Sequence, residues 1–405
     1  MERVDTTIIG AGVVGLSIAA QIAQPSKEVY IIERHASFGQ ETSSRNSEVI
    51  HSGIYYPKGS LKAITCVEGN RLLYDICASN NIPHKRIGKL IIATNLNETQ
   101  ILMSLLHRAT DNGVQDLVIL NKKEMQKIEP NIEGVAALYS PNTGIIDSHS
   151  LMLYFANKSK ANGATFIYGA TVIGIDSFHK EYKITIIDTD KESFSFISRV
   201  VINAAGLEAD TIAKLVGINT YNLLYCKGDY FKVGNHKNKL INHLIYPVPH
   251  SQNVEAKQKS RYGGAVLGIH ATINLQNELR LGPDDYYIPR SQLQGRLKPS
   301  LQQDYSVDAS KSVIFYHAVK PFLPFIEIQD LTPEQSGIRP KLQPLSQGRR
   351  GPSLQPDFDF TDFIIQDETQ NGLHNFINLI GIESPGLTAS PAIANLVAHL
   401  LSNFN

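Results

Sequence analysis

The sequence predicts an α/β protein in which a parallel sheet flanked by helices is joined to a second, α+β domain built on an antiparallel sheet. An apolar run at 6–9 enters a glycine-rich turn, and a second apolar run at 29–32 follows after about one helix length. Between about residues 221 and 335, short β-like runs alternate with polar spacers, which is typical of antiparallel strands. A chain of 405 residues is also long enough for two domains.

The glycine-rich turn has the pattern of a Rossmann-like dinucleotide-binding unit. It reads Gly10-Ala11-Gly12-Val13-Val14-Gly15. The first glycine permits the tight turn, the second lets the backbone approach a pyrophosphate, and the third allows close packing of helix and strand. Glu33 follows Gly15 by 18 residues, the spacing at which a carboxylate reaches ribose hydroxyls. This favours an unphosphorylated dinucleotide, NAD or FAD, over a turn that binds no ligand.

Composition excludes several classes of function. Apolar residues make up 42% and charged residues 19% of the chain, and 38 basic residues balance 38 acidic ones, so we expect a globular protein without a nucleic-acid partner. Three cysteines without CxxC spacing predict neither a disulfide framework nor a metal site. The first strand begins almost at the N-terminus, and no stretch approaches the roughly 20 apolar residues of a membrane span. We therefore expect a cytoplasmic protein, or one peripheral on the inner membrane.

Further elements follow from periodicity and turn residues. We expect a helix over 98–111 and another after Asp147-Ser148, which can cap it. Strand 200–202 enters a corner of small residues, 203–206. A last helix is expected after Pro391, and a mobile Pro- and Gly-rich loop over 344–356. The remaining expected strands are 89–94, 165–168, 171–175, 223–233, 265–273, 278–281, 312–320, 363–366 and 376–380.

A second motif lies at 39–57, which reads GQETSSRNSEVIHSGIYYP. Its small residues let backbone N–H groups converge on an anion, and Ser43, Ser44 and Asn46 add side-chain donors. The segment suits a cofactor phosphate and ring. The alternative is a polar loop with helix-capping residues.

Taken together, five segments resemble the D-amino-acid-oxidase-type FAD-dependent oxidoreductases, and within them most closely the L-2-hydroxyglutarate oxidases and dehydrogenases. The segments are the glycine turn with Glu33, RNSEVIHSGIYYP at 45–57, NAAG at 203–206, GIRP at 337–340 and GIESPGLT at 381–388. The resemblance covers essentially the whole chain. It implies FAD as cofactor and oxidation of L-2-hydroxyglutarate to 2-oxoglutarate by hydride transfer from C2 to the flavin.

The resemblance also implies a discontinuous FAD-binding domain, 1–87, 145–220 and 336–405, interrupted by a substrate domain, 88–144 and 221–335. It places Val172 beside the adenine and the loop 381–388 opposite the flavin pyrimidine. A helix starting just after Gly386-Leu387-Thr388 would direct its positive end at the negative charge of reduced flavin. The expected cofactor-binding residues are Gly10, Gly12, Val14, Gly15, Glu33, Arg34, Thr42, Ser43, Arg45, Asn46, His51, Val172, Ala205, Gly206, Gly381, Glu383, Gly386, Leu387 and Thr388.

Oxidation of a 2-hydroxy acid needs a base near the hydroxyl and an anchor for the carboxylate. We expect Arg339, in GIRP, to be the anchor, because an arginine fork matches a carboxylate bidentately. We expect His51 to be the base, because imidazole titrates near neutrality, and His270 is the competing candidate. A five-carbon diacid needs a second anion site, for which Lys320, Arg45, Tyr55 and Tyr246 are unranked candidates.

Three other functions remain open. An amine oxidase or dehydrogenase acting on glycine, sarcosine or a D-amino acid would share Arg339. An NAD-dependent dehydrogenase could use the same glycine turn, and a non-catalytic FAD-bound subunit would hold the flavin structurally. The electron acceptor, whether oxygen, a quinone or a carrier protein, leaves no short motif to read.

Overall fold

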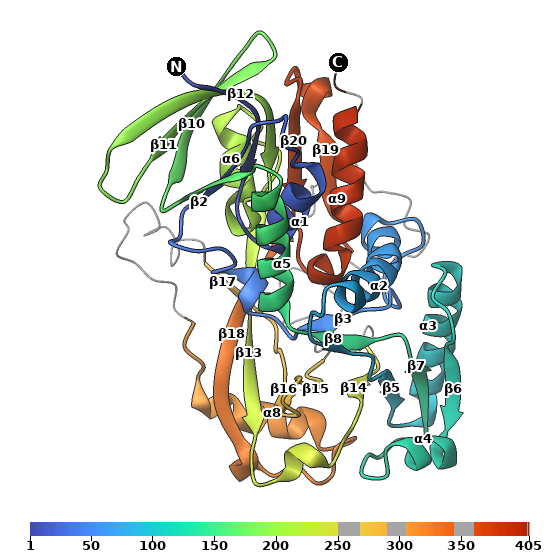
Figure 1. Ribbon diagram of the computed structural model, residues 1–405. Coiled ribbons are helices and arrows are strands. Elements are labelled where there is room, and N and C mark those ends of the chain that lie inside the picture. Colours follow the sequence, from blue (N-terminus) through green and yellow to red (C-terminus); the bar gives the residue numbers. More distant parts are fainter. Residues whose placement is uncertain (250–267, 290–304, 344–359, 403, 405) are drawn as a thin grey trace.

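The computed structural model describes residues 1–249, 268–289, 305–343, 360–402 and 404. Two large sheets occupy the two ends of the molecule, and both chain termini lie at the end that holds the first sheet (Figure 1). The loop expected over 344–356, and residues 265–267 of the strand expected at 265–273, lie outside the described residues.

The first sheet contains the predicted βαβ unit. β1 pairs in parallel with β2 on one side and with β12 on the other, and β2 pairs in parallel with β9. The first half of β12 pairs with β11, and its end pairs with β20. The strands are β1 (Arg3–Ile9), β2 (Val29–Glu33), β9 (Thr165–Tyr168), β10 (Thr171–Phe178), β11 (Glu181–Ile187), β12 (Ser193–Asn203), β19 (Ile364–Asp367) and β20 (Phe376–Ile380).

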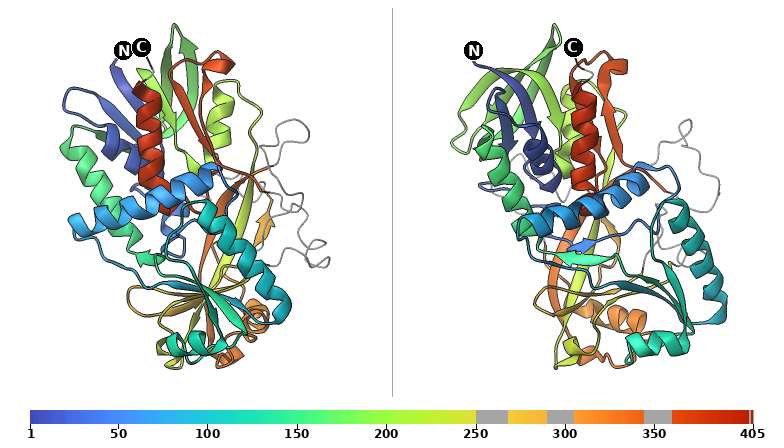
Figure 2. Two further views of the ribbon diagram at one scale, coloured as in Figure 1. Left: turned by 90° about the vertical axis from the view of Figure 1, so that its right-hand side faces the viewer. Right: turned by 45° about the vertical axis from the view of Figure 1, so that its right-hand side comes forward.

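Helices cover both faces of this sheet. α1 (Val13–Ile22), α2 (Leu61–Ser79), α5 (Ser148–Ala161) and α9 (Gly386–Ser402) bury their apolar side chains in one core, and α6 (Ala209–Leu215) packs into another. The caps follow the sequence: the Asp147 carboxylate accepts a hydrogen bond from the N–H of Ser150, as expected for α5. α2 crosses the molecule between the two large sheets (Figure 2).

The second sheet is mainly antiparallel, as predicted, although β14 and β5 pair in parallel. α4 (Lys122–Ile128) and α8 (Ser312–Val319) contribute to the core on one face, and α3 (Thr99–Asp111) to the core on the other. Its strands are β5 (Lys89–Ala93), β6 (Val118–Asn121), β7 (Ala136–Ser140), β13 (Leu223–Val233), β14 (Leu244–Pro247), β15 (Ala271–Ile273), β16 (Leu279–Leu281), β17 (Tyr286–Ile288) and β18 (Leu331–Leu342).

A small three-stranded sheet, β3 (Val49–Ile50), β8 (Gly144–Ile146) and β4 (His84–Lys85), completes the fold. Its strands lie on the segments that connect the two large sheets. The predicted domain boundary at residue 336 falls inside β18, which pairs with β13 along its length. The chain therefore leaves the second sheet after residue 342.

Three expected elements differ from the structure. Of the described part of the strand expected at 265–273, only 271–273 is strand, as β15, and 268–270 is not. The run at 312–320, expected as a strand, is helix α8: Phe315 and Val319, four residues apart, are its buried side chains, whereas Val313 and Ile314 are exposed. The last helix begins at Gly386 and not after Pro391, which lies inside it. Pro391 has no N–H to donate to the carbonyl of Leu387, and the Ser390 hydroxyl donates to that carbonyl instead, at 3.0 Å.

Candidate functional site

The glycine-rich turn joins β1 to α1 and has no room for a side chain at Gly10 or Gly15. Gly10 has φ +106°, and a Cβ there would lie 2.5 Å from the carbonyl oxygen of Ala204. A Cβ on Gly15 would lie 2.0 Å from the carbonyl oxygen of Gly10. Close packing of the turn on α1 and on the end of β12 therefore requires glycine at both positions.

Glu33, at the end of β2, holds this turn in place. Its buried carboxylate accepts hydrogen bonds from the N–H of Ala11 and the N–H of His35, each at 2.9 Å. The N-terminus of α1 carries no acidic residue and no side-chain cap from Gly12, and the N–H of Val13 donates to Ser43 Oγ at 3.0 Å. The helix thus directs its positive end toward the 42–51 segment.

The 42–51 segment packs against β18 of the second sheet. Thr42 Oγ1 donates to the carbonyl of Ile338 in β18 at 2.8 Å, and Asn46 Nδ2 donates to the carbonyl of Ser43 at 2.7 Å. A Cβ on Gly337 would lie 2.1 Å from the carbonyl oxygen of Arg45, so β18 packs directly against this segment.

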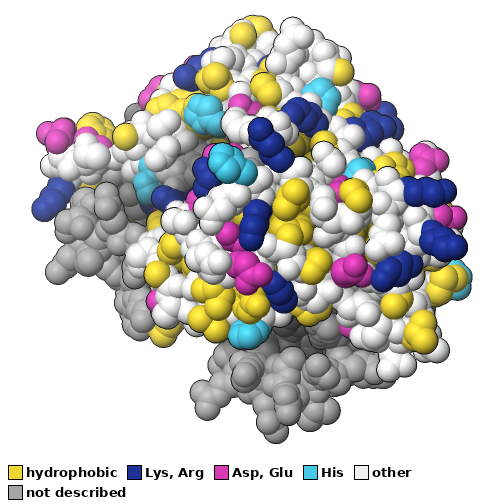
Figure 3. Space-filling view, turned by 90° about the horizontal axis from the view of Figure 1, so that it is seen from below, with side chains coloured by type: hydrophobic (Ala, Val, Ile, Leu, Met, Phe, Trp, Pro, Cys, Tyr) yellow, Lys and Arg dark blue, Asp and Glu magenta, His cyan; other side chains and the backbone are white. Residues whose placement is uncertain are grey.

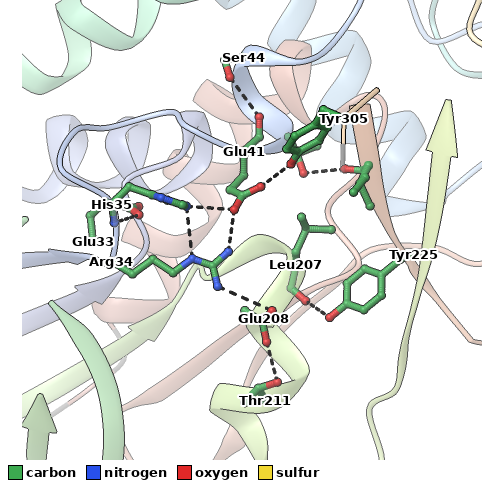
Figure 4. Close-up of polar contacts among 12 residues, drawn as sticks. Glu33, Arg34, His35, Glu41, Ser44, Leu207, Glu208, Thr211, Tyr225 and Tyr305 are labelled. Carbon is green, nitrogen blue, oxygen red and sulfur yellow. Dashed lines mark hydrogen bonds and ion pairs between the residues drawn. The ribbon is translucent and has the colours of Figure 1, made fainter. Parts of the chain in front are cut away.

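Arg34 lies in an ionic cluster beside the turn (Figure 4). Its guanidinium pairs with Glu41 at 2.8 Å and with Glu208 at 3.7 Å, and Tyr305 also donates to Glu41. The Arg45 guanidinium lies 3.6 Å from the centre of the Tyr305 ring. Both arginines expected at the cofactor are thus held by protein partners next to the turn.

His51 follows β3 and is held at its backbone. Its N–H donates to Thr388 Oγ1 in α9 at 2.9 Å, and its carbonyl accepts from Asn70 Nδ2 in α2 at 2.9 Å. The ring nitrogen Nε2 lies 3.5 Å from Ser384 Oγ. Burial, with the nearby Lys89 and His270, lowers the pKa of His51 to about 3, so the imidazole is neutral at neutral pH and able to accept a proton.

His270 is a buried imidazole. Its Nδ1 lies 3.0 Å from the carbonyl of Gly268; a carbonyl can only accept, so Nδ1 carries the proton and Nε2 keeps its lone pair. The ring stacks on Tyr246, with ring centres 3.8 Å apart. Burial also lowers the pKa of His270 to about 3, with Lys89 and Arg339 acting in the same direction.

Arg339 projects from β18. Its guanidinium forms an ion pair with Asp285, and Nη2 lies 3.9 Å from Cys226 Sγ. A guanidinium has five N–H donors, so these contacts leave donors for a further carboxylate.

The 381–388 loop and the start of α9 lie beside His51. Glu383 pairs with Lys62 of α2 at 2.9 Å; the Lys62 side chain is buried and that of Glu383 is 12% exposed. Burial would raise the pKa of Glu383, but Lys62, Lys341 and Arg339 together lower it, so the carboxylate is ionised. A Cβ on Gly69 would lie 2.2 Å from the carbonyl oxygen of Thr388, so α2 and α9 are in backbone contact here.

One cavity connects these parts. Of the residues expected at the site, it is lined by Gly12, Val14, Thr42, Ser43, Arg45, Asn46, His51, Gly206, His270, Arg339, Glu383, Gly386 and Leu387. The remaining expected residues, Gly10, Gly15, Glu33, Arg34, Val172, Ala205, Gly381 and Thr388, do not line it. Several of these support the lining: Gly10, Gly15 and Glu33 shape the turn, and Thr388 holds His51.

Comparison with known proteins identifies the family. The model of a family described as FAD dependent oxidoreductase matches residues 5–400. The chain belongs to the FAD-dependent oxidoreductase family.

Curated relatives of this FAD-dependent oxidoreductase include the mitochondrial L-2-hydroxyglutarate dehydrogenase of Arabidopsis thaliana, 38% identical over 98% of this chain and 83% of the relative. The L-2-hydroxyglutarate dehydrogenase of Indibacter alkaliphilus is 30% identical over 97% of each chain.

Solved structures of the same fold include FAD-bound L-alpha-glycerophosphate oxidase from Mycoplasma pneumoniae, with TM-score 0.80, 24% identity, and coverage of 99% of this chain and 95% of that one. Glycine oxidase from Geobacillus kaustophilus has TM-score 0.71 and 19% identity, over 100% and 96% of the two chains. The predicted fold class is confirmed, and with it the prediction of FAD as cofactor.

The residues of this oxidoreductase fit FAD. The cavity runs from the N-terminus of α1, where Gly12 has no side chain to block an approaching pyrophosphate, to the histidines and the 381–388 loop. Small residues of the 203–206 corner, Ala204 and Gly206, form part of the same wall. The N-terminus of α1 would hold the pyrophosphate of FAD, and the residues of the 381–388 loop would hold its flavin ring.

Sequence reasoning missed several lining residues, among them Ser47, Tyr230, Ser384 and Pro385. Ser47 Oγ and the Tyr230 hydroxyl lie 2.9 Å apart across the boundary of the two sheets. Their pairing depends on tertiary contacts, and no local pattern marks Tyr230. Ser384 and Pro385 belong to the GIESPGLT motif, and this motif could have identified them as site residues.

Of the anion-site candidates, Lys320 is excluded. Its ammonium donates to Glu327 and to the carbonyls of Pro324 and Ile326, and it does not line the cavity.

No helix among the described residues combines the length and apolarity needed to cross a membrane. Within the same residues, no cluster of His, Cys, Asp and Glu has the makings of a metal site. Seen from below, the described surface mixes basic and acidic side chains (Figure 3).

Proposed function

We propose that this protein oxidises L-2-hydroxyglutarate to 2-oxoglutarate. The observation that carries the proposal is the convergence of neutral imidazole and arginine on one cavity that begins at the dinucleotide turn, in a chain whose curated relatives are L-2-hydroxyglutarate dehydrogenases over nearly its full length. Bound FAD supplies the hydride acceptor.

In this proposal Arg339 binds the C1 carboxylate and thereby orients C2. His51 accepts the proton of the C2 hydroxyl, and its neutral state at neutral pH is the state required of a base. The negative charge of the substrate offsets the cost of forming a buried imidazolium. His270, whose Nε2 keeps its lone pair, is the second candidate for the base.

The two-domain division is part of the proposal. Residues 1–87 and 145–220, with the segment after β18, form the FAD-binding domain, and residues 88–144 and 221–335 form the substrate domain, with β18 attached to the latter. The support is that the parallel strands around the glycine turn belong to the first set and the antiparallel sheet to the second.

Anaerobic mixing of the purified flavoprotein with L-2-hydroxyglutarate tests the function, with D-2-hydroxyglutarate and glycine as controls. Bleaching of the flavin absorbance by the L-acid alone is expected. Reduction by glycine, sarcosine or a D-amino acid without reduction by the L-acid would contradict the proposal and favour the amine-oxidising alternative, which the fold of glycine oxidase also permits. Reoxidation by oxygen, a quinone or a carrier protein then identifies the electron acceptor.

The anchor is tested separately. Arg339→Met should raise KM for L-2-hydroxyglutarate by about 30-fold or more, because a charge-assisted pair to the C1 carboxylate is lost. Flavin content measured on the same sample serves as the control. An unchanged KM would remove Arg339 from substrate binding.

A further inference from the structure

Lys89 is a buried cation for which the proposed reaction has assigned no role. It is the first residue of β5, and only 1% of its surface is exposed. Its ammonium lies 4.7 Å from the centre of the Tyr55 ring and 4.8 Å from that of Tyr246. Among the described residues, no carboxylate lies within ion-pair distance of it.

A buried ammonium without a counter-ion is costly. The two aromatic faces offset part of this cost through cation–π attraction. The cost that remains favours the neutral amine, and burial accordingly lowers the pKa of Lys89 to about 7. An anion placed beside the ammonium would restore its charge.

The two tyrosines add unused donors. The hydroxyl oxygens of Tyr55 and Tyr246 are both buried, and neither has a hydrogen-bond partner within the described part of the chain. Burial raises the pKa of both phenols, so each hydroxyl keeps its proton and can donate. An ammonium and two phenols without an acceptor form the donor set that binds a carboxylate.

This group adjoins the reaction site. Tyr246 lines the cavity and stacks on His270, and Lys89 lies near enough to His51 and His270 to depress the pKa of both. His270 is also within electrostatic reach of Arg339. Arg339 of β18 lines this cavity directly, whereas Lys89 of β5 and Tyr55 do not line it and are joined to it by Tyr246, whose ring centre lies 4.8 Å from the Lys89 ammonium.

We propose that Lys89, together with the hydroxyls of Tyr246 and Tyr55, binds the second carboxylate of a dicarboxylic 2-hydroxy acid and so selects dicarboxylates over monocarboxylates. The inference rests on the proposed function, since it assigns the first carboxylate to Arg339. Lys89 is a specificity residue in this scheme and takes no part in proton transfer.

The test compares two acids of equal chain length, L-2-hydroxyglutarate and L-2-hydroxypentanoate, which lacks the second carboxylate. Lys89→Met should lower kcat/KM for the diacid by about 100-fold, mainly through KM, and leave the monoacid unchanged. Tyr246→Phe and Tyr55→Phe, which remove only the hydroxyls, should each lower kcat/KM for the diacid by about 10-fold. Lys123 is an exposed lysine of α4, so Lys123→Met is the matched control and should leave kcat/KM unchanged for both acids.

Two results would overturn the inference. An equal loss of kcat for both acids in Lys89→Met would make Lys89 part of the chemistry, as a base. Unchanged kinetics for both acids would make it a structural residue.

A binding measurement separates this inference from the proposed function. Glutarate and pentanoate carry no hydroxyl to oxidise, and their binding can be followed by perturbation of the flavin spectrum. Glutarate should bind about 100-fold more tightly than pentanoate to the wild type, and about equally in Lys89→Met. If L-2-hydroxyglutarate fails to reduce the flavin but this preference is present, the proposed function fails and the dicarboxylate site stands; if wild type shows no preference for glutarate, the site itself is refuted.

Discussion

Lys89→Met should stabilise the protein, and by an amount that depends on pH. The pKa of Lys89 falls from its ordinary value of 10.5 to about 7 in the folded state because the side chain is buried. Each tenfold change in a protonation equilibrium is worth about 1.4 kcal/mol, so the charged lysine costs about 5 kcal/mol of folding free energy below pH 7. Methionine has a similar length and carries no charge.

The direction of the pH dependence follows from the number of protons that the folded and unfolded states bind. Below pH 7 the lysine is protonated in both the folded and unfolded states, and the full cost is present. Between pH 7 and 10.5 the folded protein holds the neutral amine while the unfolded chain holds the proton, so the cost shrinks as pH rises, to about 2 kcal/mol at pH 9. The titratable groups around Lys89 are His51, Cys66, His270, Tyr55 and Tyr246, and all are present in both proteins.

Thermal unfolding in excess FAD measures the effect. An unfolding entropy of about 2.1 cal/mol/K per residue gives about 0.85 kcal/mol/K for a chain of 405 residues. The Tm of Lys89→Met should therefore exceed that of the wild type by about 6 °C at pH 6 and by about 2 °C at pH 9. Lys123→Met should show no such pH-dependent difference. A lower Tm for Lys89→Met at pH 6, or the same difference at both pH values, would refute the reasoning.

Three further predictions concern the site. His51→Asn should lower kcat by about 10²- to 10⁴-fold at unchanged flavin content, and an unchanged kcat would transfer the role of base to His270. Gly15→Ala places a Cβ 2.0 Å from the carbonyl oxygen of Gly10, so it should lose bound FAD; a full flavin-to-protein absorbance ratio would contradict this. Lys62→Met leaves the buried Glu383 without its partner and should lower the free energy of unfolding by about 3–5 kcal/mol in urea titrations, whereas a change below about 1 kcal/mol would show that other cations suffice.

The sequence was informative wherever the determining interactions are local. The glycine turn, strand 223–233 and the Asp147 cap of α5 are each specified by a few consecutive residues, and the structure confirms them. Segment 312–320 shows the limit of such reasoning. A short apolar run fits either a strand or a helix, and the choice of helix came from the burial of Phe315 and Val319 on one face.

The arrangement of the site was decided by tertiary structure. Lys89, Tyr55 and Tyr246 are far apart in the sequence, and the lysine reads locally as the start of an ordinary apolar strand. Its burial between two aromatic rings exists only after β5 and β14 pair and the 45–57 segment brings Tyr55 beside them. Lys320, which the sequence had offered as an anion-site candidate alongside Tyr55 and Tyr246, instead donates to Glu327 and two backbone carbonyls. By itself the sequence thus determined the fold class and the dinucleotide turn, because these depend on local patterns, whereas burial and the pairing of charges depend on contacts across the whole chain and were decided by the folded structure.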